Sequence, residues 1–231
     1  MEHIHSVIAS LWAWAMLPIS GAAEHSIAPL VAWHARLMVL AWSVLIPLGV
    51  IVARFYKVTP GQDFPRVVDH KFWWTVHRST QYTAVGMAAL AWLLVWPGRG
   101  WGWHQAAGYA VLALGLAQVL GGQLRGTKGG PSDVAKGLAL RGDHYDMTRH
   151  RRIFEWWHKR LGYASLALTV LATALGLFLA DAPRWMVLTI GLWWLVLVCA
   201  FCRLQRQGRA VDTYKAIWGH AFGESPMERD A

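Results

Sequence analysis

Six apolar stretches follow one another along the chain, separated by short polar connections. They cover approximately residues 4–20, 28–53, 72–96, 101–124, 156–180 and 185–202. A bilayer core about 30 Å thick needs roughly 20 helical residues, and every stretch except the first is long enough to cross it. The pattern therefore predicts an all-α integral membrane protein with six transmembrane helices, or five if the first stretch is cleaved.

The first stretch is the shortest of the six. Its start, Met1-Glu2-His3, lacks the positive charge that a signal peptide carries, which favours a helix. We expect residues 1–27 to form a first transmembrane helix or a signal-like segment and residues 28–204 to form the transmembrane core. Residues 205–231 are then a cytoplasmic C-terminal tail.

Charge gives the expected orientation. Only 15% of residues are charged, against roughly 25% in soluble domains, which excludes an ordinary soluble fold. Eighteen of the 22 lysines and arginines lie in residues 54–71, 125–160 and 203–231, so the positive-inside rule places these segments in the cytoplasm. Both termini are then cytoplasmic if the first stretch spans. The net charge of +9 reflects this orientation signal, and no nucleic-acid partner is predicted.

Four histidines lie within consecutive apolar stretches, one in each: His34, His77, His104 and His158. An unpartnered imidazole is costly in hydrocarbon, so these side chains indicate a function. Because successive helices cross in opposite senses, His34 and His104 fall near the outer ends, and His77 and His158 near the inner ends. Packing histidines bonded to neighbouring helices are the alternative reading, but it does not explain the matched levels.

Two imidazoles at one level on facing helices meet the need of an iron porphyrin for axial ligands from both sides. The sequence therefore predicts two haem groups, one near each membrane face and roughly 15–20 Å apart along the bilayer normal.

The residues one turn after these histidines share their helix faces. Two of the four are glycines, Gly108 and Gly162, which would let a flat cofactor lie against the backbone. The other two are Met38, as apolar padding, and Gln81, as a hydrogen-bond partner.

Haem propionates are anionic and need cationic or donor side chains near the interfaces. The candidates are Arg36 and Trp103 at the outer site, and Arg78, Lys159 and Arg160 at the inner site. Side chains that snorkel to the interface as orientation charges are an equally good reading.

Two cysteines, Cys199 and Cys202, form a C-x-x-C pattern inside the last apolar stretch. Arg203 follows them, so the C-x-x-C-H pattern of covalent haem attachment is absent. Packing within a membrane helix is the expected role.

The segments around the four histidines resemble the cytochrome b561 family over nearly the whole range from His34 to about Leu204. They include HARLM from His34, FWWTVHRSTQ from Phe72, and two His-x-x-x-Gly-Tyr helices that begin at His104 and His158. The resemblance implies a four-helix core that holds two b haems, ligated by the first with the third and the second with the fourth core helix. The depth of the histidines predicts the same pairing.

The resemblance also implies electron transfer across the membrane, from ascorbate or from soluble domains or dehydrogenases. The expected partners are membrane lipid, an electron donor and an acceptor (a quinone, an ascorbate-like reductant or a redox protein), and a homodimer partner or a dehydrogenase. The basic loop at residues 125–155 would receive an anionic reductant, a quinone or an acidic partner, or serve only as an orientation signal. We expect a multi-pass protein of a bacterial inner membrane.

Three functions remain open from the sequence. The first is a dihaem electron conduit, with or without ascorbate-, quinone- or ferric-reductase-like oxidoreductase activity. The second is the haem b anchor subunit of a membrane dehydrogenase that delivers electrons to quinone. The third is a transporter of haem or protons, or an assembly factor. No catalytic side chain is predicted, and the four histidines are expected only as iron ligands.

Overall fold

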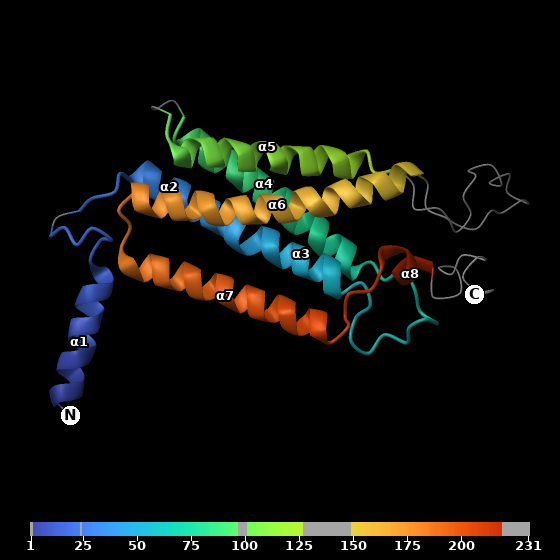
Figure 1. The fold of residues 1–231 in the computed structure, drawn as a ribbon, viewed down its shortest axis with the longest axis horizontal. Helices are drawn as coiled ribbons and strands as arrows, with labels where there is room; N and C mark the ends of the chain where they lie inside the picture. The colour runs from blue at the N-terminus through green and yellow to red at the C-terminus, as the bar shows by residue number, and fades with distance from the viewer. Residues whose placement is uncertain (1, 24, 97–100, 127–148, 219–231) are drawn as a thin grey trace, which may run out of the picture.

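The computed structural model describes residues 2–23, 25–96, 101–126 and 149–218, and these fold as helices joined by loops (Figure 1). The elements are α1 (Glu2–Met16), α2 (Pro29–Met38), the π-helix η1 (Val39–Leu45), α3 (Ile46–Phe55), α4 (Phe72–Leu94), α5 (Trp103–Gln123), α6 (Arg149–Leu179), α7 (Arg184–Arg206) and α8 (Thr213–Trp218).

Four helical segments among the described residues are long and apolar enough to cross a membrane: Pro29–Phe55, Trp103–Gln123, Arg149–Leu179 and Arg184–Arg206. Helix α4 has 23 residues and runs along the same bundle, but its polar run from His77 to Gln81 makes it less apolar. The predicted all-α membrane bundle is confirmed.

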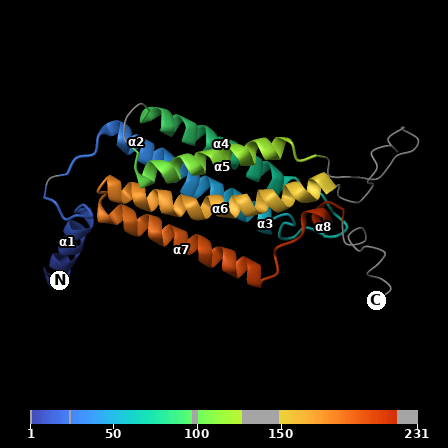
Figure 2. The same cartoon turned by 45° about the horizontal axis from the view of Figure 1, so that its top comes forward.

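Helix α1 differs from the others in length and direction. Its 15 residues give about 22 Å, which is shorter than the roughly 30 Å of a bilayer core. It leaves one end of the bundle at a steep angle to the long axis (Figures 1 and 2). The expected sixth spanning helix at residues 4–20 is thus a shorter helix that stands apart from the bundle.

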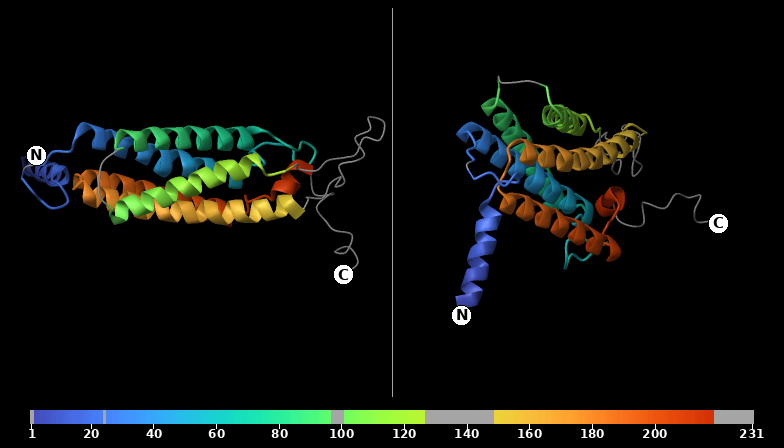
Figure 3. Two further views of the ribbon diagram at one scale, coloured as in Figure 1. Left: turned by 90° about the horizontal axis from the view of Figure 1, so that it is seen from above. Right: turned by 60° about the vertical axis from the view of Figure 1, so that its left-hand side comes forward.

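The rest of the bundle consists of two helical hairpins and α7. The continuous helix α2–η1–α3 packs along α4, and α5 packs along α6, as Figure 3 shows from above. Between the two hairpins, at mid-height, lies an apolar cluster of Ala41, Trp42, Ile46, Ala84, Ala88 and Val111. The Trp42 ring lies so close to α5 that a Cβ at Gly115 would be 2.7 Å from it.

Pro47 explains how α7 is attached to the first hairpin. Proline has no N–H, so in a regular helix the carbonyl four residues earlier loses its partner. That carbonyl belongs to Ser43, which lies in the π-helical stretch, and it accepts a hydrogen bond of 2.7 Å from Trp193 Nε1 in α7. The Ser43 carbonyl therefore has a hydrogen-bond donor from a neighbouring helix, as a backbone polar group inside a membrane requires.

Helix α6 begins at Arg149, seven residues before the apolar stretch that was predicted to form it. Its first turns are polar but held by pairs at i,i+4 spacing: Glu155 lies 3.3 Å from Arg151 and 3.0 Å from Lys159. Such pairs stabilise a helix without any membrane burial. The expected loop at residues 125–155 is therefore helical from Arg149 onward, while residues 127–148 lie outside the described ranges.

Candidate functional site

The four membrane histidines meet in two pairs between the hairpins. The ring centroids of His34 and His104 are 6.2 Å apart at an interplanar angle of 86°. Those of His77 and His158 are 6.1 Å apart at 80°. Each pair joins one histidine of the α2–α4 hairpin to one of the α5–α6 hairpin, in the combinations expected from the sequence.

These separations fit a metal ion between each pair of rings. A metal–imidazole bond is about 2.0 Å, and each ring centre lies about 1 Å behind its nitrogen, so two axial imidazoles have centroids about 6 Å apart. Among the described residues, no three side chains of His, Cys, Asp or Glu gather into one group. Each pair thus offers two ligands, which suits an iron whose other four ligands come from a porphyrin.

The two pairs lie at different levels of the bundle. His104 contacts the α6 backbone at Ala172, fourteen residues after His158, and His34 contacts the α4 backbone at Ala91, fourteen residues after His77. Fourteen helical residues rise about 21 Å. Two helices therefore give the same separation, which is slightly larger than the roughly 15–20 Å expected from the sequence.

Backbone carbonyls fix the orientation of three of the four rings. The Nδ1 atoms of His34, His77 and His104 lie 2.9, 3.2 and 3.0 Å from the carbonyl oxygens of Ala91, Gly49 and Ala172. An Nδ1–H that donates to a carbonyl leaves Nε2 unprotonated, with its lone pair free for a metal. Histidines that bind metals are held in this way.

His158 is held differently from the other three. Its Nδ1 is buried and has no hydrogen-bond partner among the described residues. The Phe154 ring lies one turn away at 5.0 Å and only 33° from parallel, and Gln118 Nε2 donates to the His158 carbonyl at 2.9 Å. Packing and a backbone contact, rather than an Nδ1 hydrogen bond, position this ring.

The residues one turn beyond the histidines have varied surroundings. A Cβ at Gly108 would meet nothing within 4 Å, and one at Gly162 would meet only Gln118 Nε2 at 3.5 Å, so both positions leave free space. Met38 packs against the central apolar cluster. Gln81 donates to the carbonyl of Ile46 at 3.3 Å, and the partner of His77 is instead Gly49. A cofactor-binding role for these residues stays a prediction.

The predicted propionate partners lie around the helix ends, and most of them contact neighbours other than the histidines. Trp103 is 83% exposed at the start of α5. The guanidinium groups lie over tryptophan rings, and the lysine pairs with Glu155: Arg36 with Trp33, Arg78 with Trp74, Arg160 with Trp156, and Lys159 with Glu155. Binding of propionates by these side chains stays a prediction.

Two glycines of the site were not identified from the sequence. A Cβ at Gly176 would lie 2.9 Å from His104 Cε1, and one at Gly49 would overlap Thr80 Oγ1. Both positions therefore need glycine to let a histidine-bearing helix approach. Gly49 belongs to a PLGV run after Pro47, whereas Gly176 stands in an apolar helix with no neighbouring motif that marks it.

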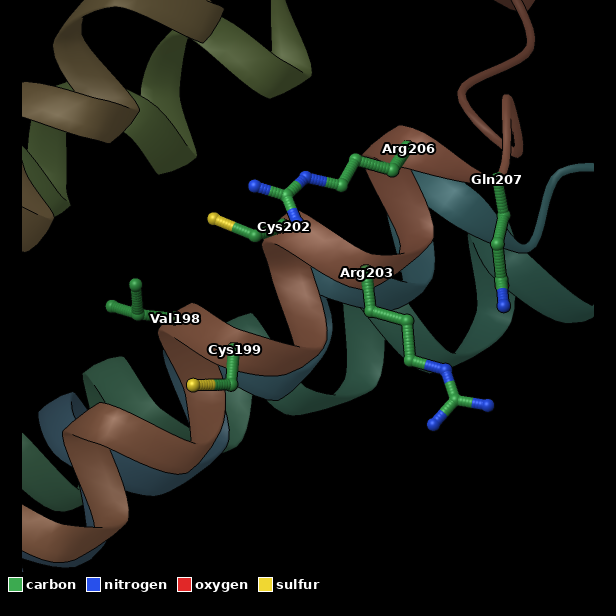
Figure 4. A pocket seen from close by; sticks show the side chains of 6 residues that line it. All are labelled: Val198, Cys199, Cys202, Arg203, Arg206 and Gln207. Carbon is green, nitrogen blue, oxygen red and sulfur yellow. The ribbon is translucent and has the colours of Figure 1, made fainter.

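The C-x-x-C pair lies away from the histidines. Cys199 and Cys202 are exposed on α7, in a shallow depression that Val198, Arg203, Arg206 and Gln207 complete (Figure 4). The pair faces outward from the protein instead of packing between its helices.

Comparison with known proteins gives a consistent picture. Ferric-chelate reductase 1 of Homo sapiens is 28% identical over 150 residues, or 62% of this chain and 22% of the reductase, and that of Bos taurus matches equally over 149 residues. A cytochrome b561 and DOMON domain-containing protein of Arabidopsis thaliana is 26% identical over 166 residues, 69% of this chain and 35% of that protein. The chain thus spans about a fifth to a third of these relatives.

No family model matches the chain. No solved structure matches it either. The relatives named above come from animals and a plant, so a bacterial inner membrane stays a prediction. The resemblance read from the sequence is confirmed at this level: the chain is similar to ferric-chelate reductase 1 and to cytochrome b561 and DOMON domain-containing proteins.

Proposed function

We propose that the chain carries electrons across a membrane through two b-type haems, one held by His34 with His104 and the other by His77 with His158. The observation that carries the proposal is the presence of two imidazole pairs at the spacing of axial ligands, about 21 Å apart along the bundle. The resemblance to cytochrome b561 proteins supports the same cofactor.

The histidines would supply both axial nitrogens at each site. A bound haem supplies one-electron redox chemistry at its iron, and with both axial positions filled it has no free coordination site for a substrate. Carbonyl partners at Ala91, Gly49 and Ala172 hold three rings in the tautomer that a metal requires. Gly108 leaves space beside His104 for a flat ring.

An apolar cluster lies between the two levels. It is centred on Trp42 and Ala88 and is buried between the hairpins. Close packing of this kind excludes ions and water while keeping atoms in contact from one level to the next. Such a core permits electron transfer and resists leakage of ions.

The basic end of the bundle gives the proposed orientation. Arg54, Lys57, Arg151 and Arg206 lie at the end that carries His77 and His158, so we place that end in the cytoplasm. The pair of His34 and His104 then lies near the outer face. A ferric chelate, as in the names of the reductases, is one acceptor to test there, and a quinone or a redox protein is another.

Haem content tests the proposal directly. Purified protein should contain about two haems per chain in a pyridine haemochrome assay, with low-spin b-type bands in the redox difference spectrum. His104→Ala and His158→Ala should each remove one haem and spare the other. His5→Ala, in the exposed helix α1, is the matched control and should retain both.

Two results would refute the proposal. One is folded, active protein without stoichiometric haem, which would favour the transporter or assembly factor. The other is a full haem complement in both single variants. Co-purification of a dehydrogenase subunit would favour the anchor-subunit alternative while leaving the haem ligands unchanged.

A further inference from the structure

Helix α1 has two unlike faces, and the electron path uses neither. Large apolar side chains that are between 45% and 67% exposed cover a broad face of this helix: Ile4, Val7, Ile8, Leu11, Trp12, Trp14 and Met16. A narrower face carries small or polar residues: Ser6, Ala9, Ser10 and Ala13. A helix with these two faces and few charges has the pattern of one that lies in a membrane–water interface.

The direction of α1 is set by contacts just after it ends. The backbone of residues 17–19 pairs with the turn between α6 and α7, through Ile19 N to the Ala182 carbonyl at 3.1 Å and Arg184 N to the Leu17 carbonyl at 3.0 Å. Asp181 accepts two further bonds, from the Ser20 amide at 2.8 Å and the Ser20 hydroxyl at 2.6 Å.

We call residues 17–20 with residues 181–184 the clasp. The Ser20 hydrogen bonds hold the pKa of the Asp181 carboxyl below its usual value, so the carboxylate is charged at neutral pH and keeps both bonds. The clasp fastens α1 to the end of the bundle opposite the basic end. From there α1 leaves the bundle at a steep angle to the bundle axis (Figure 1 and the right-hand view of Figure 3).

The apolar face of α1 lies on the side of this helix that faces the start of α7. Trp14 belongs to that face, and the Arg184 guanidinium, at the start of α7, lies 5.1 Å from its ring centre. Because α7 continues from Arg184 into the membrane, the side of α1 that carries Trp14 borders the lipid around α7. The opposite face then points to water.

From this geometry we propose that α1 lies in the outer membrane–water interface, with its apolar face among the lipid acyl chains next to α7 and its serine face in water. It does not cross the bilayer. The partner of this helix is therefore a lipid surface. The inference needs the bundle to span a membrane but does not depend on haem, so it can fail independently of the proposed function.

Cysteine labelling in sealed vesicles of one orientation tests the side on which α1 lies. The background is the full chain with Cys199→Ser and Cys202→Ser, and the probe is a membrane-impermeant maleimide. Ala23→Cys marks the clasp side and Asp63→Cys the basic side. Ser6→Cys should label together with Ala23→Cys. The proposal would be overturned if Ser6→Cys is labelled from the same side as Asp63→Cys, or if the maleimide labels Ser6→Cys from neither side of the membrane.

Spin labels test the two faces separately. In the same background, a spin label attached at Leu11→Cys should collide mainly with lipid-soluble oxygen. A spin label attached at Ser10→Cys should collide mainly with a water-soluble nickel complex. Adjacent positions that differ in this way indicate a helix in the interface. If oxygen dominates at both positions, α1 is embedded in the bilayer, and if nickel dominates at both, it is detached from the membrane; either outcome contradicts the proposal.

Discussion

Gly176 offers a test of the outer pair that leaves all four histidines in place. In Gly176→Ala the added methyl carbon would lie 2.9 Å from Cε1 and 3.1 Å from Nδ1 of His104. Nδ1 is also the atom that bonds the Ala172 carbonyl at 3.0 Å, so the ring cannot move away without losing that bond. Overpacking of this kind costs about 1–3 kcal/mol.

If that cost falls on the outer site, the affinity of the His34–His104 pair for haem should drop by about 5- to 150-fold. After extensive washing in detergent, haem per chain should fall from about two toward one, while the remaining low-spin signal keeps the midpoint potential of the inner site. Gly191→Ala in α7 is the control, because a Cβ there meets nothing within 4 Å. Two firmly bound haems with unchanged potentials in Gly176→Ala would show that His104 does not lie against α6.

Two further predictions concern stability in detergent. Burial lowers the pKa of Lys57 from its ordinary 10.5 to about 8, so the unfolded chain binds this proton more tightly and stability should rise between about pH 8 and pH 10.5. Lys57→Met should remove this rise in the free energy of unfolding, which is at most about 3 kcal/mol. If the unfolding temperature changes equally with pH in both proteins, the amine is not buried. Trp193→Phe should lower the free energy of unfolding by about 1 kcal/mol, because the Ser43 carbonyl loses its donor. Trp194→Phe is the control for that measurement, and an equal loss in both variants would show that the hydrogen bond contributes nothing.

The sequence predicted the long helices well because hydrophobicity records which residues face lipid. The expected stretch at 101–124 compares with α5 at Trp103–Gln123, and the stretch at 72–96 with α4 at Phe72–Leu94. Hydrophobicity failed where a helix continues into water. Arg149 begins α6 because ion pairs stabilise its first turns, and such pairs carry no apolar signal.

The histidine pairs could be anticipated for a similar physical reason. A polar ring in an apolar stretch stands out, and its depth follows from helix length and direction alone. The atoms that orient the rings could not be anticipated, because the carbonyls of Ala91 and Ala172 belong to the backbone and every residue has one. The role of Gly176 also depends on which helix faces His104, and that is known only once the hairpins are packed.

Each histidine pair draws one member from each hairpin, and neither hairpin contains a complete pair. A metal centre held in this way would act as a cross-link between two halves of one chain, at two heights. Ligands that bind only the assembled form stabilise it by mass action. The cell's supply of the cofactor would then govern how much of this protein stays assembled, and a shortage would appear first as separation of the halves.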